Sequence, residues 1–255
     1  MSGLCADYPP AELRPSPNFG VRSAGRTPDM LVLHYTGMET AEGALDWLCM
    51  PESQVSAHYL VHEDGLIVQM VAEAKRAWHA GSSVWKGETD INSASIGIEI
   101  VNPGHDGDYS DFPAPQIAAV VDLCRNCADR WSIPPERVVA HSDIAPMRKA
   151  DPGEKFPWRS LSDRGVGHWV EPSRAGGGRF LQRGDAGQPI EALQAMLRLY
   201  GYGIEVNGRY DDLTAAVVTA FQRHFRPARV DGIADVSTIE TLHRLLSTLP
   251  TAKAG

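Results

Sequence analysis

Two short apolar runs that each stop at a histidine constrain the fold of this chain most strongly. Met30–Leu33 is followed directly by His34, and the run that begins at Val138 stops at His141. Short continuous apolar runs are typical of strands that are buried on both faces, as in the parallel part of a sheet. A histidine at the end of a buried strand is held still. Both runs therefore predict a fixed imidazole at the end of a sheet strand.

The remainder of the first 170 residues predicts more strands interleaved with helices. Apolar runs at 57–61 and 66–71 flank Glu63-Asp64-Gly65, and Asp-Gly between two such runs is a strong hairpin signal. The strand expected at 95–101 places its three isoleucines on one face, with Gly97 and Glu99 on the other. Helices are expected at 41–48 and 115–131, and residues 1–28 read as an irregular arm. This order predicts an α/β (α+β) fold, with a mixed central β-sheet flanked by helices.

The composition changes near residue 170, and a length of 255 residues suits one full domain plus a small one. The Gly-rich stretch 173–178 is typical of a flexible linker. Beyond it, three helices are expected at 190–200, 213–225 and 236–249, with Asp211 and Asp235 as N-caps. We therefore expect a catalytic domain over 1–170, a linker over 171–180 and a small three-helix domain over 181–255. The last five residues are expected to be frayed.

Composition and charge exclude several classes of protein. No apolar run is long enough to cross a bilayer, and a formal net charge of -8 argues against a nucleic-acid partner. The N-terminus has neither a basic nor an apolar signal region, which predicts a cytoplasmic protein. The sequence does not fix the oligomeric state, and we expect a monomer. Cys124 and Cys127 form a C-x-x-C pair that suggests either redox chemistry or half a zinc site. They also fall on the apolar stripe of the 115–131 helix, which favours buried small hydrophobes.

The two strand-end histidines point to a metal when Asp151 is added to them. Asp151 lies ten residues after His141, in a loop stiffened by Pro152-Gly153 that can return it to the same point. Three N/O ligands with a fourth position left for water are the arrangement of a catalytic zinc. Zinc lowers the pKa of bound water to about 7 and polarises a carbonyl. Each histidine alone is more simply read as a satisfied polar residue, whereas the whole set favours a site.

Glu99 and Lys149 suit the chemistry of such a site. A glutamate midway along so apolar a strand is out of place unless something on its face requires a carboxylate. It fits a general base for the water on the metal, with a structural ion pair as the alternative. Lys149 fits a cation that stabilises the oxyanion of a tetrahedral intermediate, with a solvated loop lysine as the alternative.

Several motifs along residues 28–160 together resemble one family. They are His-Tyr-Thr at 34–36, Ser-Ala-His-Tyr-Leu-Val at 56–61, Trp-His-Ala-Gly at 78–81, Ser-Ile-Gly-Ile-Glu at 95–99, His-Ser-Asp at 141–143 and Lys-Ala-Asp-Pro-Gly at 149–153. In this order they resemble the zinc-dependent N-acetylmuramoyl-L-alanine amidases of the type 2 class, whose fold is shared by the animal peptidoglycan recognition proteins. After residue 181, the matching positions are mostly turn glycines and helix-core residues, among them Leu193-Gln194, Gly201-Tyr202, Asn207–Asp211 and Val230-Asp231-Gly232. With these, the segment resembles the three-helix peptidoglycan-binding domain of wall hydrolases.

The resemblance implies hydrolysis of the amide between the lactyl group of N-acetylmuramic acid and L-alanine, in peptidoglycan or muropeptides. It implies that His34, His141 and Asp151 hold Zn²⁺, with Glu99 as the base and Lys149 as the oxyanion partner. Matches at four further residues suggest substrate contacts or packing: His58, Tyr59, Trp78 and His79.

Two alternatives remain open from the sequence. A binding protein that recognises peptidoglycan without cutting it is the alternative to an enzyme, although all the implied catalytic residues are present. A cytoplasmic enzyme would recycle soluble anhydro-muropeptides, whereas a wall-binding domain points instead to the periplasm or the cell wall. By holding the chain near its substrate, the C-terminal domain would raise the local substrate concentration.

Overall fold

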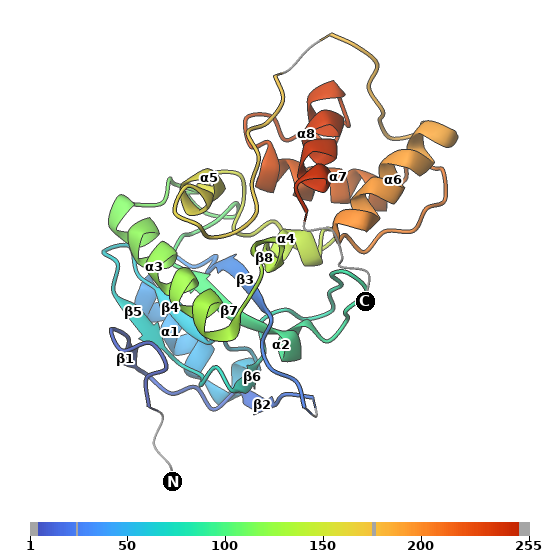
Figure 1. The fold of residues 1–255 in the computed structure, drawn as a ribbon. Coiled ribbons are helices and arrows are strands. Elements are labelled where there is room, and N and C mark those ends of the chain that lie inside the picture. Colours follow the sequence, from blue (N-terminus) through green and yellow to red (C-terminus); the bar gives the residue numbers. More distant parts are fainter. Residues whose placement is uncertain (1–4, 24, 175–176, 250–255) are drawn as a thin grey trace.

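A six-stranded mixed sheet forms the centre of the computed structural model, which describes residues 5–23, 25–174 and 177–249 (Figure 1). The strand order is β1-β5-β4-β7-β3-β8. Strands β4, β7, β3 and β8 are parallel, β5 is antiparallel to β4, and β1 is parallel to β5. Their bounds are β1 Glu12–Leu13, β3 Met30–Tyr35, β4 Tyr59–Val61, β5 Ile67–Gln69, β7 Ser95–Ile100 and β8 Val138–Ala140. The expected mixed sheet is confirmed.

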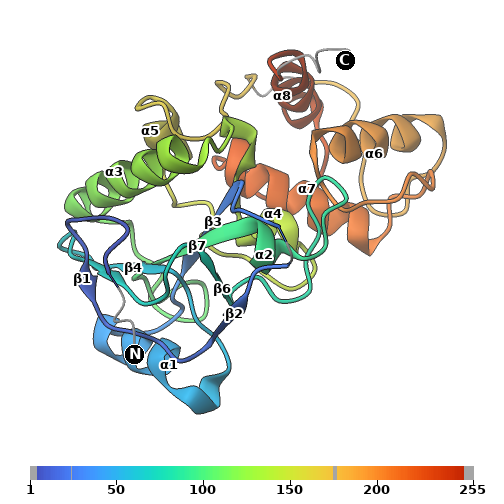
Figure 2. The same ribbon diagram turned by 60° about the horizontal axis from the view of Figure 1, so that its bottom comes forward.

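Helices cover both faces of this sheet, with α3 (Ala114–Trp131) on one side and α1 (Ala41–Cys49) on the other (Figures 1 and 2). In β4, Tyr59 and Val61 pack into the α3 cluster, whereas Leu60 between them packs into the α1 cluster. Successive strand residues thus serve opposite faces, as a doubly covered sheet requires. Cys124 and Cys127 are buried in the α3 cluster as free thiols, and burial raises the pKa of both.

Short elements that carry no sequence pattern account for the errors in the expected fold. The arm over residues 1–28 is not wholly irregular, because β1 joins the main sheet and β2 (Phe19–Val21) pairs with β6 (Lys75–Ala77). Two or three residues are too few for a periodicity to be visible. His141 begins the short helix α4 (His141–Ile144) rather than ending β8. The other short elements are α2 (Ile91–Ala94), α5 (Trp158–Ser162) and the 3₁₀ turns Pro51–Ser53 and Pro135–Arg137.

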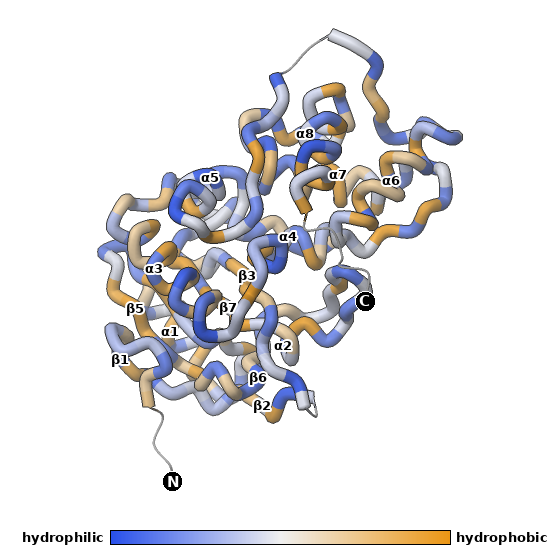
Figure 3. Tube along the Cα trace, in the orientation of Figure 1, coloured by the Kyte–Doolittle hydropathy of each residue, from blue (hydrophilic) through white to orange (hydrophobic). Residues whose placement is uncertain are grey.

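Three amphipathic helices follow, α6 (Gln188–Tyr200), α7 (Asp212–Phe225) and α8 (Val236–Ser247). Figure 3 shows apolar and hydrophilic stretches alternating along them. Asp211 and Asp235 cap α7 and α8, accepting hydrogen bonds from the N–H groups of residues 214 and 238 at 2.8 and 2.9 Å. The expected frayed end at 251–255 lies outside the described residues. None of the described helices is long and apolar enough to cross a membrane.

The C-terminal helices share a buried apolar cluster with the sheet. Met30, Val32 and Val139 belong to the same cluster as Tyr200 and Tyr202. In the stretch expected to be a flexible linker, the N–H of residue 173 donates to a threonine hydroxyl of α8 at 3.0 Å, and residues 175–176 lie outside the described residues. The C-terminal helices are therefore packed against the sheet and not merely tethered to it.

Candidate metal centre

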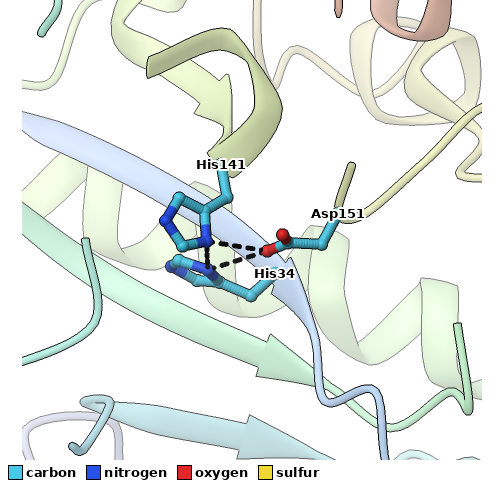
Figure 4. A group of neighbouring side chains, drawn as sticks. All are labelled: His34, His141 and Asp151. Atoms are coloured by element: carbon cyan, nitrogen blue, oxygen red, sulfur yellow. Dashed lines mark hydrogen bonds and ion pairs between the residues drawn. The ribbon is translucent and has the colours of Figure 1, made fainter. Parts of the chain in front are cut away.

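Three side chains from separate parts of the chain converge beside the sheet: His34, His141 and Asp151 (Figure 4). His34 lies near the end of β3, His141 is the first residue of α4, and Asp151 lies in the loop that follows. The Nδ1 atoms of the two histidines are 2.9 Å apart, and each is 3.0 Å from Oδ2 of Asp151. All three residues are buried, so the structure brings the predicted ligand set together.

The Nε2 atom of each histidine points away from the cluster and makes a hydrogen bond elsewhere. Nε2–H of His141 donates to the carbonyl of Ala80 at 3.1 Å, which leaves its Nδ1 lone pair facing the cluster. Nε2 of His34 lies 3.0 Å from Nδ1 of His79. Which nitrogen of His79 carries the proton therefore decides which nitrogen of His34 is free.

A serine fixes the proton on His79. The hydroxyl of Ser95 donates to the carbonyl of Ile91 at 2.6 Å, so its oxygen accepts from Nε2–H of His79 at 3.2 Å. Nδ1 of His79 is then an acceptor, and Nε2–H of His34 donates to it. Both Nδ1 atoms in the cluster therefore carry lone pairs.

Electrostatics favours a neutral His34 beside an ionised Asp151. Burial, reinforced by His141, lowers the pKa of His34 to about 4. Burial alone would raise the pKa of Asp151, but His141 and His34 hold that pKa well below its usual range. Two neutral nitrogens and one carboxylate are the donor set that zinc prefers.

Glu99 and Lys149 line the same cavity, whose volume is about 460 Å³. Glu99 is the register partner of His34 across the parallel β7–β3 ladder. Its Oε2 is buried and has no hydrogen-bond partner among the described residues. Burial, with the charge of Asp151 beside it, raises the pKa of Glu99 well above its usual value. A carboxyl group of this kind is suited to accepting and returning a proton near neutral pH. Lys149 lies on the exposed rim.

The four remaining predicted residues separate into two pairs. Trp78 and His79 line the cavity, whereas His58 and Tyr59 do not. His58 accepts the N–H of residue 97 at Nδ1, and Tyr59 donates its hydroxyl to Glu73 at 2.6 Å. Both side chains are fully buried in this network, so we assign neither a substrate contact.

The sequence reasoning did not include several cavity-lining residues: Trp47, His105 and Arg148. Trp47 is the one that a sequence signal could have found. It falls off the buried stripe of α1, which is Ala44, Leu45 and Leu48, and it is 48% exposed. A tryptophan on the solvent face of an amphipathic helix indicates a binding surface.

A mixed sheet that presents two histidines, one aspartate and an unpaired glutamate in one cavity defines the class of metal-dependent hydrolases. Residues 24–154 match the family described as N-acetylmuramoyl-L-alanine amidase, and residues 186–242 match the putative peptidoglycan binding domain. The chain belongs to the N-acetylmuramoyl-L-alanine amidase family. This family consists of zinc amidases, and the assignment answers the alternative of a binding protein without activity.

Two similar proteins, both named as amidases, agree with this assignment. N-acetylmuramoyl-L-alanine amidase AmiD of Escherichia coli is 38% identical over 234 residues, which are 85% of this chain and 82% of that protein. The 1,6-anhydro-N-acetylmuramyl-L-alanine amidase AmpD of the same organism is 37% identical over 162 residues, which are 56% of this chain and 86% of AmpD.

Two solved structures superpose over most of the chain. AmiD from E. coli, in complex with the substrate anhydro-N-acetylmuramic acid-L-Ala-D-gamma-Glu-L-Lys, gives a TM-score of 0.75 at 36% identity, covering 88% of this chain and 91% of AmiD. AmpDH3 from Pseudomonas aeruginosa gives 0.72 at 32% identity, covering 97% of this chain and 100% of AmpDH3. AmpDH3 has also been solved in complex with an anhydromuramic pentapeptide. This chain is an enzyme that hydrolyses the amide between N-acetylmuramic acid and L-alanine.

Proposed function

We propose that His34, His141 and Asp151 bind one zinc ion, and that the chain hydrolyses anhydro-muramyl peptides with Glu99 and Lys149 as its catalytic residues. The observation that carries the proposal is the convergence of three lone pairs in the cavity that holds the unpaired Glu99. The ligands of a tetrahedral zinc with bonds near 2.0 Å are about 3.3 Å apart. The three atoms at 2.9–3.0 Å are close to that spacing, and they fit the ion.

The chain's own residues supply the proton transfers. Bound zinc would supply Lewis acidity, polarising the lactyl carbonyl and lowering the pKa of water. Glu99 accepts a proton as the water oxygen bonds to the carbonyl carbon, and returns it to nitrogen as the C–N bond breaks. The products are a free lactyl carboxylate and a peptide with an L-alanine amino terminus. The Lys149 cation stands at the rim, where it can stabilise negative charge developing on the carbonyl oxygen.

The rim of the cavity supports an amphiphilic sugar–peptide substrate. Trp47 and Trp78 offer flat apolar surfaces suited to a pyranose ring, and Arg148 offers a cation suited to a peptide carboxylate. The two relatives solved with anhydro-muramyl peptides support this substrate class. We propose that 181–255 forms a peptidoglycan-binding unit, joined to the catalytic domain 1–170 by the linker 171–180. The monomeric state and the cytoplasmic compartment expected from the sequence remain predictions.

Glu99→Gln separates the role of the base from metal binding. We expect the variant to keep one zinc per chain and to release peptide from an anhydro-muramyl tripeptide about 10²–10⁴-fold more slowly, because the amide cannot accept the proton. Zinc content by atomic emission and product release by chromatography are the two measurements. His34→Ala is the contrasting variant, and it should lose the metal itself.

Two outcomes would contradict the proposal. Near-normal turnover by Glu99→Gln would show that Glu99 is not the base. Wild-type activity that survives complete removal of zinc by a chelator would remove the metal from the reaction.

A further inference from the structure

Asp143, two residues after the proposed ligand His141, is held mainly by the C-terminal part of the chain, through Tyr202 in the loop after α6 and His224 in α7. Its carboxylate is fully buried and accepts three hydrogen bonds. One comes from the backbone N–H of Ala140 at 2.8 Å. The other two come from the hydroxyl of Tyr202 at 2.7 Å and from Nδ1–H of His224 at 2.6 Å. Two of its three donors therefore belong to the part of the chain that matches a peptidoglycan-binding domain.

The helix that carries Asp143, α4, also carries the proposed ligand His141 and is hydrogen-bonded to the proposed ligand Asp151. His141 is the first residue of α4, and its carbonyl accepts from the N–H of Ala145 at 3.0 Å. The N–H of Ser142 donates to the carbonyl of Asp151 at 3.0 Å. Two of the three proposed ligands are thus tied to this single turn. A shift of α4 would move His141 and Asp151 relative to His34.

Packing from both parts of the chain fixes the two donors. The His224 ring stacks on Trp158, with centroids 3.7 Å apart and planes at 23°. Tyr202 packs edge-on against Trp85, with centroids 5.1 Å apart. Tyr202 and His224 are 1% and 2% exposed, so water cannot replace either donor without a rearrangement of the junction. Without them, a buried carboxylate would keep one hydrogen bond, which is a costly state.

We propose that Tyr202 and His224 are positioning residues for the metal site, acting through Asp143 and α4 on His141 and Asp151. The C-terminal helices would then have a second function beside peptidoglycan binding, which is to hold the zinc ligands in place. This inference rests on the proposed zinc site. It assigns to residues outside the cavity an effect on metal affinity.

The test compares two buried tyrosines of the full-length chain. Tyr202→Phe removes one donor to Asp143 and keeps the ring. Tyr200→Phe removes a hydroxyl that is bonded instead to Nδ1 of His168 at 2.9 Å, and Tyr200 is equally buried. Zinc affinity is measured by competition with a chromogenic chelator, well below the unfolding temperature. We expect Tyr202→Phe to weaken zinc binding by about threefold to tenfold and Tyr200→Phe to stay near wild type. The expected loss is below the roughly 10–100-fold of direct outer-shell partners, because Tyr202 acts through Asp143.

Two substitutions at position 224 separate hydrogen bonding from packing. His224→Phe keeps the stack on Trp158 and loses the donor, whereas His224→Asn loses the ring and keeps a donor near the place of Nδ1. We expect weaker zinc binding in His224→Phe than in His224→Asn. Unfolding midpoints of the zinc-free proteins are measured in parallel, because a merely structural role would lower these midpoints without changing zinc affinity.

The outcomes distinguish this inference from the site on which it rests. Failure of the wild type to bind one zinc per chain would overturn the proposed metal site. Normal zinc binding by the wild type, with unchanged affinity in Tyr202→Phe and His224→Phe, would overturn the positioning role alone. An order reversed between His224→Asn and His224→Phe would also overturn it, since ring packing would then be the operative contact.

Discussion

Single hydrogen bonds decide the protonation of the histidines around the cavity. His58 is an example outside the metal cluster. The N–H of residue 97 donates to its Nδ1, and its Nε2–H donates to the carbonyl of Lys75 at 3.0 Å. Only the neutral ring can make both bonds. Burial, with the cation of Arg22 beside the ring, lowers the pKa of His58 to about 3.

This neutral histidine predicts a loss of stability in acid. The unfolded chain binds a proton at position 58 below about pH 6.5, whereas the folded chain does so only near pH 3. The stabilisation is therefore complete above pH 6.5 and is lost as the pH falls toward 3, by on the order of a few kcal/mol. Urea unfolding at several pH values should give a steeper acid slope for the wild type than for His58→Gln. Equal slopes would contradict the assignment.

The sequence predicted which residues meet in the cavity better than it predicted their surroundings. His34, Glu99, His141, Lys149 and Asp151 could be predicted because strand ends, strand alternation and a short loop place them almost automatically. His58 and Tyr59 were harder, because a motif does not say whether a side chain faces the cavity or the interior. That choice depends on distant partners, such as Glu73 for the tyrosine.

At the scale of elements, Gly97 of strand β7 makes room for the ring of His79, which comes from the loop after β6. A methyl group added at Gly97 would lie 2.5 Å from Cγ of His79, so only glycine lets that ring lie flat against the strand. His79 in turn fixes the proton on His34, the proposed metal ligand. One backbone position on β7 therefore sets the orientation of a proposed ligand on β3.

Gly97→Ala should accordingly displace His79. We expect the free energy of unfolding to fall by about 1–3 kcal/mol through overpacking. We also expect zinc affinity to fall about tenfold or more through loss of the outer hydrogen bond. Gly20→Ala is the control, since its added methyl group would lie 3.7 Å from the nearest atom, Nε1 of Trp78. Urea unfolding and chelator competition measure the two effects, and unchanged zinc affinity in Gly97→Ala would remove His79 from the support of the site.

The longer elements could be predicted from sequence because their residues repeat a pattern. The buried strands, the α3 stripe and the two aspartate caps are of this kind. Strands β1, β2 and β6 could not, because each is two or three residues long and exists only through pairing with a distant segment. The helix α4 could not be predicted either, because its four residues are too few to show a helical repeat.

At the scale of the whole molecule, the shared apolar cluster makes the sheet and the C-terminal helices one body. Trp85, from the first part of the chain, is 1% exposed and packs against Tyr200 and Tyr202. An added methyl group at Gly201 would lie 2.6 Å from this indole. The sequence predicts two units joined by a linker, and a change of composition can report such a boundary but not the contacts made across it.

One cooperative unfolding transition is the expected consequence. Calorimetry should give equal calorimetric and van't Hoff enthalpies for the wild type. Gly201→Val should force the junction open and split the transition. Gly177→Ala should leave it single, because no atom of the described residues outside its chain neighbours lies within 4 Å of the added methyl group. Two well-separated transitions in the wild type would contradict the prediction.

The ladder between β3 and β7 has a consequence for redesign. Because His34 and Glu99 are register partners, the separation of the proposed metal ligand and the proposed base is inherited from the spacing of two hydrogen-bonded strands. No loop sets it. The surfaces that we propose for substrate contact, by contrast, come from α1 and from the loops that carry Trp78 and Arg148. An engineer seeking a different acyl group or peptide could therefore vary the exposed face of α1 and the side chains of Trp78 and Arg148. His79, Lys149 and Asp151 in the same loops would have to stay, because the proposed site depends on them.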